Sequence, residues 1–147
     1  MSSFTPAEDA TCRRLVSMAL EEDLGTAGDV TSQAIIPADL QGSAAFVARA
    51  DGVIAGLPAA ALVCAAVDAR LFFQPLLSDG SRVQPGDRLA VVSGPMRGIL
   101  AAERTALNFL QRLSGIATLT RRYVDAVAGL PVKILDTRKT TPGWRLL

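Results

Sequence analysis

The longest regular pattern in the sequence is helical and runs from Met96 to about Val127. Ser114-Gly115 interrupts this run, and we expect it to break or kink the helix, because glycine weakens a helix interior. Gly129-Leu130-Pro131 ends the second piece. Apolar residues recur on one side at helical spacing, at Ile99, Ala102, Ala106, Leu107, Leu110 and Leu113.

The same helix predicts self-association. Met96, Ile99, Phe109 and Leu113 add more apolar surface than one small domain is expected to cover. Exposed apolar patches of that size mark interfaces, so we expect a homodimer.

The other segments predict an α+β fold. Thr5-Pro6-Ala7-Glu8 is typical of a helix start with a capping box, and Gly25 ends that helix. A polar loop is expected over residues 26–32, and a short buried helix over residues 58–67. The expected strands cover residues 44–49, 52–55, 70–77, 89–92 and 132–136. The expected core consists of Leu71, Phe72, Val83, Leu89 and Val91 with Leu107 and Leu110 of the long helix.

The last expected strand has no evident neighbour after it. Backbone groups of a strand need hydrogen-bond partners, so a lone strand at a chain end indicates that part of the fold is missing.

Composition excludes several kinds of chemistry. The chain has no histidine, so it cannot hold a Ser-His-Asp or Cys-His catalytic group of its own. A formal net charge of +1 argues against a basic nucleic-acid binder. Cys12 and Cys64 lack metal-ligand spacing and are typical of buried residues in a reducing compartment. The sequence shows neither a signal pattern nor a membrane span, so we expect a cytoplasmic protein.

The strongest local motif is Asp136-Thr137-Arg138-Lys139-Thr140-Thr141-Pro142-Gly143. It follows the expected last strand, and the carboxyl end of a strand is where α/β proteins bind ligands. Arg138 offers a planar fork for a carboxylate or phosphate, and Lys139 offers a point charge. A solvated loop is the alternative interpretation.

Three other motifs allow both a functional and a structural interpretation. Arg104 and Asn108 share one face of the long helix, where they are either a polar site or a surface pair with a network amide. The acidic loop around Glu22-Asp23 and Asp29 could hold a hard cation or be structural. The turn at Gly86-Asp87 resembles that of biotinyl-carrier domains, but no lysine lies in a nearby hairpin.

In this order, the motifs resemble the quinolinate phosphoribosyltransferase family, also called nicotinate-nucleotide pyrophosphorylase (carboxylating). Two long, nearly unbroken segments carry most of the resemblance, residues 101–118 and 136–143. Shorter matches are Glu22-Asp23-Leu24-Gly25, Gly28-Asp29-Val30-Thr31, Asp79-Gly80 and Val83-x-x-Gly86-Asp87. The resemblance begins at about Ala19.

The resemblance implies an N-terminal sandwich domain of α/β-hammerhead type with a mostly antiparallel sheet, over residues 1–115. Residues 116–147 would be the linking helix and first strand of an incomplete α/β barrel. Family members make nicotinate mononucleotide, carbon dioxide and pyrophosphate from quinolinate and phosphoribosyl pyrophosphate, with magnesium, as homodimers.

The resemblance also implies residue roles. Arg104 would reach into the partner subunit's pocket and contact a quinolinate carboxylate. Arg138 would bind a carboxylate in bidentate fashion, Lys139 would lie near the phosphoribosyl group, and Thr137 would orient the substrate. The family's magnesium ligands and its His-Arg pair lie in a part of the barrel that this sequence does not contain. Trp144 stands where relatives usually carry a smaller aliphatic residue.

We therefore expect the chain to be a fragment that is inactive alone, with no catalytic residue and no metal ligand of its own. Two alternatives stay open. One is a paralogue of the molybdenum-transport type, and the other is a non-catalytic dimerisation module. We expect neither nucleic-acid nor membrane binding.

Overall fold

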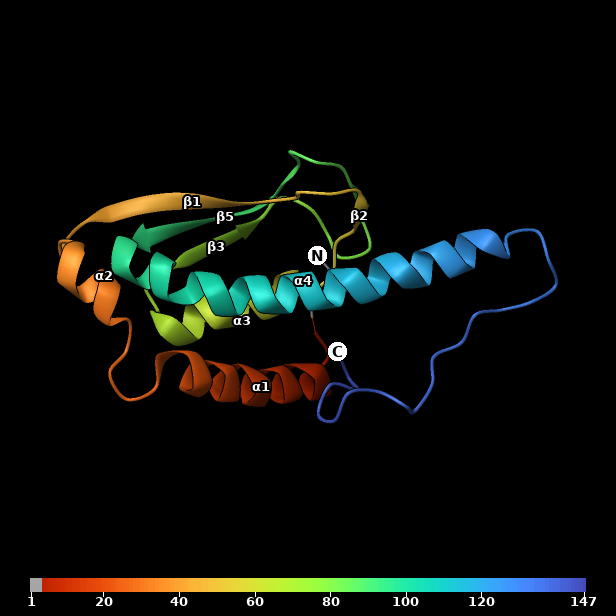
Figure 1. Ribbon diagram of the computed structural model, residues 1–147, viewed down its shortest axis with the longest axis horizontal. Helices are drawn as coiled ribbons and strands as arrows, with labels where there is room; N and C mark the ends of the chain where they lie inside the picture. Colours follow the sequence, from red (N-terminus) through yellow and green to blue (C-terminus); the bar gives the residue numbers. More distant parts are fainter. Residues whose placement is uncertain (1–3) are drawn as a thin grey trace.

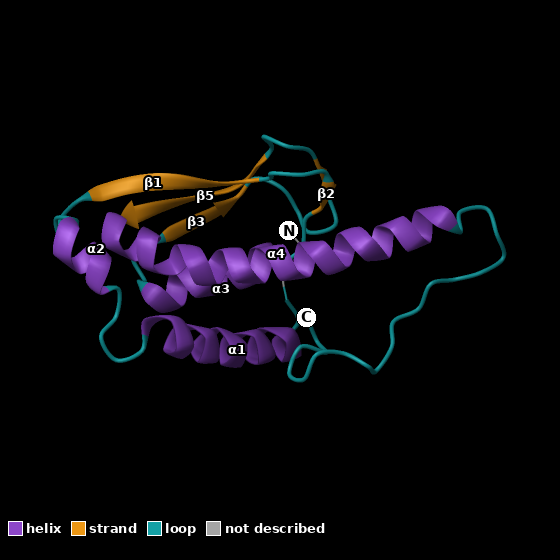
Figure 2. Ribbon diagram, viewed as in Figure 1, coloured by secondary structure: helices purple, strands orange, loops and turns teal. Residues whose placement is uncertain are grey.

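The computed structural model describes residues 4–147 and confirms the α+β fold (Figures 1 and 2). A sheet lies on one side, the helices α3 and α4 lie beneath it, and α1 packs on their far side. The helices are α1 (Pro6–Leu24), α2 (Val30–Ile35), α3 (Leu57–Val67) and α4 (Met96–Ala126). The strands are β1 (Gln41–Val47), β2 (Gly52–Val53), β3 (Phe72–Pro75), β4 (Arg82–Val83) and β5 (Arg88–Pro95).

The main sheet is antiparallel in the order β1-β5-β3, and β2 pairs separately with β4. Successive residues of a strand point to opposite faces, so the register decides which side chains are buried. Phe73 lies opposite Val92 and packs against Phe46 of β1, with ring centroids 5.7 Å apart. The prediction of Phe72 as a core residue is wrong, because it lies on the outer face and is 64% exposed. Val92 is 2% exposed and Val91 is only partly buried, so Val92 takes the place expected for Val91.

The long helix α4 is continuous, so the expected break at Ser114-Gly115 is wrong. The Ser114 hydroxyl bonds the backbone of Ala55 instead of its own helix: Ala55 N donates to Oγ at 3.0 Å, and Oγ lies 3.1 Å from Ala55 O. Gly115 faces open space. One glycine costs a helix roughly 1 kcal/mol, which the packing of the whole buried face outweighs.

The domain itself covers most of the apolar surface that predicted a homodimer. Ile99, Phe109 and Leu113 are all buried under the sheet and against α3. That reason for dimerisation is therefore wrong. The exposed apolar residues of α4 lie chiefly in its second half, at Ile116, Leu119, Tyr123 and Val124.

Helix α3 is buried, as its alanine-rich sequence predicts, and it packs tightly on α4. Gly56 precedes it with φ +100°, and a Cβ there would lie 2.8 Å from Cδ1 of Leu113. Only glycine satisfies both the backbone and this close approach. The Asp79 carboxylate accepts bonds from Gly56 N at 2.8 Å and Leu57 N at 3.0 Å, so it satisfies free N–H groups at the start of α3.

Helix α1 begins and ends as the sequence predicts, with a Thr5–Glu8 capping box and Gly25 at its end. Its residue Cys12 is completely buried, and Cys64 of α3 is 1% exposed. Burial raises the pKa of both thiols to about 11, so they are protonated at neutral pH.

The expectation of a polar loop across residues 26–32 is only partly right. Asp29 accepts a bond from Ser32 N at 3.0 Å and caps the short helix α2. Arg97 of α4 donates to the carbonyls of Gln33 and Ile36, which ties α2 to the start of the long helix.

The predicted strand at residues 132–136 is wrong for this chain. These residues carry no strand pairing and are exposed. A strand forms only where a neighbour supplies hydrogen-bond partners, and the described residues provide none there. After α4 the chain runs back beside the molecule, and its last residues lie near α1 (Figure 1).

We predict that Leu110→Ala lowers the free energy of unfolding by about 2–5 kcal/mol, because Leu110 is 4% exposed and its loss leaves a cavity. Leu107→Ala is the matched control. Leu107 is only partly buried, so its loss should cost clearly less. Urea unfolding followed by circular dichroism measures both, and equal losses would contradict the assigned face of α4.

Candidate functional site

Arg104 lies in the first third of α4 and points away from the core. Its Nη1 donates to Oδ1 of Asp23 at 2.5 Å, and its side chain is 74% exposed. The hydrogen bond and charge of Asp23 raise the pKa of Arg104. Asp23 thus fixes one edge of the guanidinium and leaves the other N–H groups facing solvent.

The acidic loop is structural in this fold. Asp23 pairs with Arg104, and Asp29 caps α2. Hydrogen bonds from Ser32 lower the pKa of Asp29, and the nearby charge of Arg104 contributes weakly. Within residues 4–147 no group of three or more His, Cys, Asp or Glu side chains could hold a metal ion.

Thr137, Arg138 and Lys139 lie together in the exposed segment that follows α4. Lys139 N donates to the Thr137 hydroxyl at 3.1 Å. Arg145 donates to the Arg138 carbonyl at 3.2 Å, which restrains the backbone at this point. The three side chains are exposed to solvent and available to a ligand.

Within one subunit, Arg104 does not lie next to this segment. Arg104 pairs with Asp23 near the end of α1, whereas Gly143 approaches Leu15 in the middle of that helix. The distance from Leu15 to Asp23 along the helix is roughly 12 Å at 1.5 Å per residue. The predicted site residues therefore form two separate groups.

Trp144 holds the end of the chain against α4. Its ring stacks on Phe109 with centroids 5.1 Å apart, and the Arg112 guanidinium lies 5.2 Å from its centroid. Arg112 also donates a hydrogen bond to the Thr141 hydroxyl. We call this group of four residues the Trp144 anchor. The sequence shows Trp144 as unusual, but no local pattern identifies its partners.

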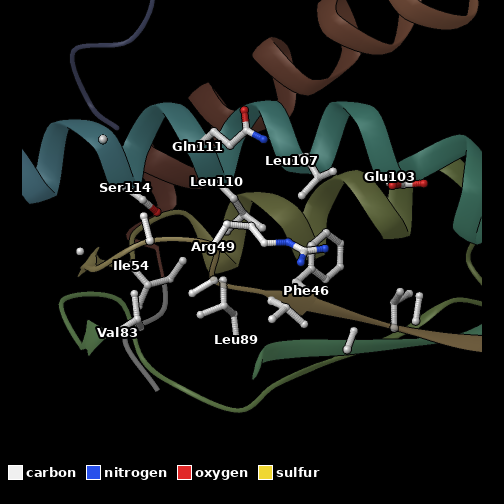
Figure 3. Close-up of a pocket in the computed structure, with 18 of the residues that line it drawn as sticks. Phe46, Arg49, Ile54, Val83, Leu89, Glu103, Leu107, Leu110, Gln111 and Ser114 are labelled. Atoms are coloured by element: carbon white, nitrogen blue, oxygen red, sulfur yellow. The ribbon is translucent and has the colours of Figure 1, made fainter. Parts of the chain in front are cut away.

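A cavity of about 690 Å³ lies between β1 and α4 (Figure 3). Its wall is mostly apolar, with Phe46, Ile54 and Leu110 among the lining residues, while Arg49 and Glu103 add charge. None of Arg104, Thr137, Arg138 and Lys139 lines it. Sequence reasoning missed this cavity because its wall comes from several elements that are distant in the chain.

Comparison with known families identifies the family of this chain. The family model for the quinolinate phosphoribosyl transferase N-terminal domain matches residues 29–114, and the model for the C-terminal domain of the same family matches residues 116–147. The chain therefore belongs to the quinolinate phosphoribosyl transferase family.

Individual relatives agree. Quinolinate phosphoribosyltransferase [decarboxylating] 1b of Nicotiana tabacum is 45% identical over 133 residues, which is 90% of this chain and 37% of the relative. The chloroplastic nicotinate-nucleotide pyrophosphorylase [carboxylating] of Arabidopsis thaliana is 44% identical over 135 residues, which is 92% of this chain and 38% of the relative.

Solved structures show the same fold. The Francisella tularensis nicotinate-nucleotide pyrophosphorylase superposes with a TM-score of 0.89 at 36% identity, covering 99% of this chain and 52% of that one. NadC of Streptococcus pyogenes superposes with a TM-score of 0.87 at 38% identity, and the superposition covers 97% of this chain and 49% of NadC. The chain thus spans about half the length of these structures and less than two fifths of the curated relatives.

None of the helices between residues 4 and 147 is both long and apolar enough to cross a membrane.

We predict that Arg112→Ala loosens the Trp144 anchor. The change removes a cation–π contact and a hydrogen bond, each worth about 1 kcal/mol, so the equilibrium constant for docking of the segment should fall roughly 30-fold. Acrylamide quenching of Trp144, the sole tryptophan, measures this docking. Arg121→Ala is the control, because Arg121 lies on the same helix and pairs with Asp125. Quenching that is unchanged in Arg112→Ala would contradict the anchor.

Proposed function

We propose that this chain provides the N-terminal domain and the start of the barrel domain of a quinolinate phosphoribosyltransferase. Such an enzyme converts quinolinate and phosphoribosyl pyrophosphate to nicotinate mononucleotide, carbon dioxide and pyrophosphate, in NAD biosynthesis. The observation that carries the proposal is the match to the models of both family domains in consecutive order, over residues 29–114 and 116–147. The domain boundary is proposed at residues 115–116, within α4.

The chemistry of quinolinate supports the roles proposed for the cationic residues. Quinolinate carries two carboxylates on one ring, so its site needs fixed positive charge and planar donors. Arg104 and Arg138 would each bind a carboxylate, Thr137 would orient the ring, and Lys139 would lie toward the phosphoribosyl group. Fixed cations would also stabilise the negative charge that develops as carbon dioxide leaves.

The separation of the two groups favours a pocket shared between two subunits. Arg104 of α4 lies beside Asp23 at the end of α1, while Thr137–Lys139 lie in the segment beyond α4. A homodimer in which Arg104 of one subunit enters the pocket of the other would unite them, and the exposed apolar second half of α4 is available for contact.

Magnesium would be bound outside these residues. The described part of the chain offers no suitable cluster of ligands. We further propose a cytoplasmic location, which the buried, unpaired state of Cys12 and Cys64 supports.

Two alternatives make different predictions. A paralogue of the molybdenum-transport type would bind another substrate at the same positions. A dimerisation module would need neither Arg104 nor Arg138, so removing either cation would leave its assembly and function unchanged.

We predict that Arg104→Ala weakens quinolinate use by roughly 10- to 150-fold in an active assembly, because a charged hydrogen bond in a partly dry site is worth about 1.5–3 kcal/mol. Arg104→Lys should recover little, because lysine lacks the planar fork. Steady-state kinetics with varied quinolinate measures both variants. The active assembly is this chain supplemented with a polypeptide that carries the remaining part of a relative's C-terminal domain.

A mixing experiment tests whether Arg104 serves the partner's pocket. Arg104→Ala and Arg138→Ala subunits, each strongly impaired alone, are combined. One site of the mixed dimer then carries both defects and the other carries neither, so up to half the activity of that dimer should return. If heterodimers form without activity, the shared pocket is refuted.

We predict that the purified 147-residue chain forms no nicotinate mononucleotide by itself, and that the supplemented assembly does. Positioning of the pyrophosphate leaving group requires a metal site, and residues 4–147 show no cluster of ligands for one. Chromatography measures nicotinate mononucleotide in both samples. Turnover by the chain alone would overturn the expectation, and turnover in neither sample would count against the proposed function.

A further inference from the structure

A second cleft lies where the end of the chain returns to α1, with a volume of about 380 Å³. Helix α1 contributes Thr11 and Arg14, and the returning segment contributes Thr140, Thr141 and Arg145 among others. None of the lining residues is acidic. The cleft is separate from the proposed substrate residues, since neither Arg104 nor residues 137–139 line it.

The two arginines of this cleft form no salt bridge with a carboxylate among residues 4–147. Arg14 donates to the Thr11 hydroxyl at 3.3 Å, and Arg145 donates to a backbone carbonyl. The carboxylates in the first turn of α1 are engaged elsewhere: Glu8 completes the capping box, and Asp9 pairs with Arg13. Two uncompensated guanidinium groups at one cleft favour an anion.

The threonine hydroxyls are arranged as donors to the same space. A hydroxyl has one hydrogen to donate and can accept from other groups. Thr11 already accepts from Arg14, and Thr141 already accepts from Arg112 of the Trp144 anchor. Both hydroxyl hydrogens therefore remain free to donate to a ligand, and Arg112 places a third positive charge one hydrogen bond away.

We propose that this cleft binds a phosphoryl group, as a phosphate or phosphomonoester dianion, through Arg14 and Arg145 with the hydroxyls of Thr11 and Thr141. Its donors come from two elements, so they approach the ligand from different directions. A tetrahedral dianion offers several acceptor oxygens to such donors, whereas a carboxylate offers two in one plane. Binding would also hold the returning segment on α1, because half of the site belongs to that segment.

The test is a titration of the 147-residue chain with inorganic phosphate at constant ionic strength, followed by Trp144 fluorescence and by calorimetry. Two charged contacts correspond to a dissociation constant on the order of 1 mM. Arg14→Gln and Arg145→Gln should each weaken binding about tenfold or more. Arg13→Gln is the matched control, because Arg13 neighbours Arg14 but pairs with Asp9 outside the cleft. A phosphomonoester in place of inorganic phosphate distinguishes the two ligand sources.

Three results would overturn the proposal: no saturable binding of phosphate, equal affinity in Arg14→Gln and Arg13→Gln, or equal affinity for acetate and phosphate. Arg145→Gln also removes the hydrogen bond to the Arg138 carbonyl, and its Trp144 emission without phosphate shows whether the segment stays docked. Arg14→Gln does not alter the returning segment, so the phosphate affinity of this variant is the deciding measurement if Arg145→Gln releases the segment. Because these measurements need no turnover, their result is independent of the proposed enzymatic function.

Discussion

The packing of α3 against α4 is the contact on which the rest of the structure depends. Gly56 lets the two helices approach closely, and Asp79 satisfies the backbone at the start of α3. The buried face of α4 then supports the sheet on one side, while α1 closes the other. Because α4 is continuous, the position of the core also fixes the outward direction of Arg104. A side chain on a rigid helix is held more precisely than one on a loop.

The sequence predicted those features that depend on local chemistry. The capping box at Thr5–Glu8 formed as expected, and Gly25 ends that helix as expected. Local propensity failed where a tertiary contact outweighed it. The interruption at Ser114-Gly115 did not break α4, because the serine found its partner on the neighbouring Ala55.

Features that depend on the neighbours of a segment were harder to predict. Phe72 and Phe73 are identical in type, and only the register of β3 on β5 decides which one faces the core. Residues 132–136 have a sequence suited to a strand, but pairing requires a neighbour. The candidate site residues could be predicted from motifs, since residues 104 and 137–139 lie in segments that resemble the family. No motif predicted the Trp144 anchor or the two clefts, because each joins elements that are far apart in the chain.

The burial of both cysteines has a practical consequence. Cys12 and Cys64 lie in the core, on helices that pack against each other, and each thiol is protonated at neutral pH because burial raises its pKa to about 11. A thiol reagent needs both access and the thiolate, and the folded chain denies it both. Labelling therefore requires α1 or α3 to come away from the core. The rate of alkylation in native buffer would then measure how often that part of the molecule opens, site by site, without a perturbing mutation.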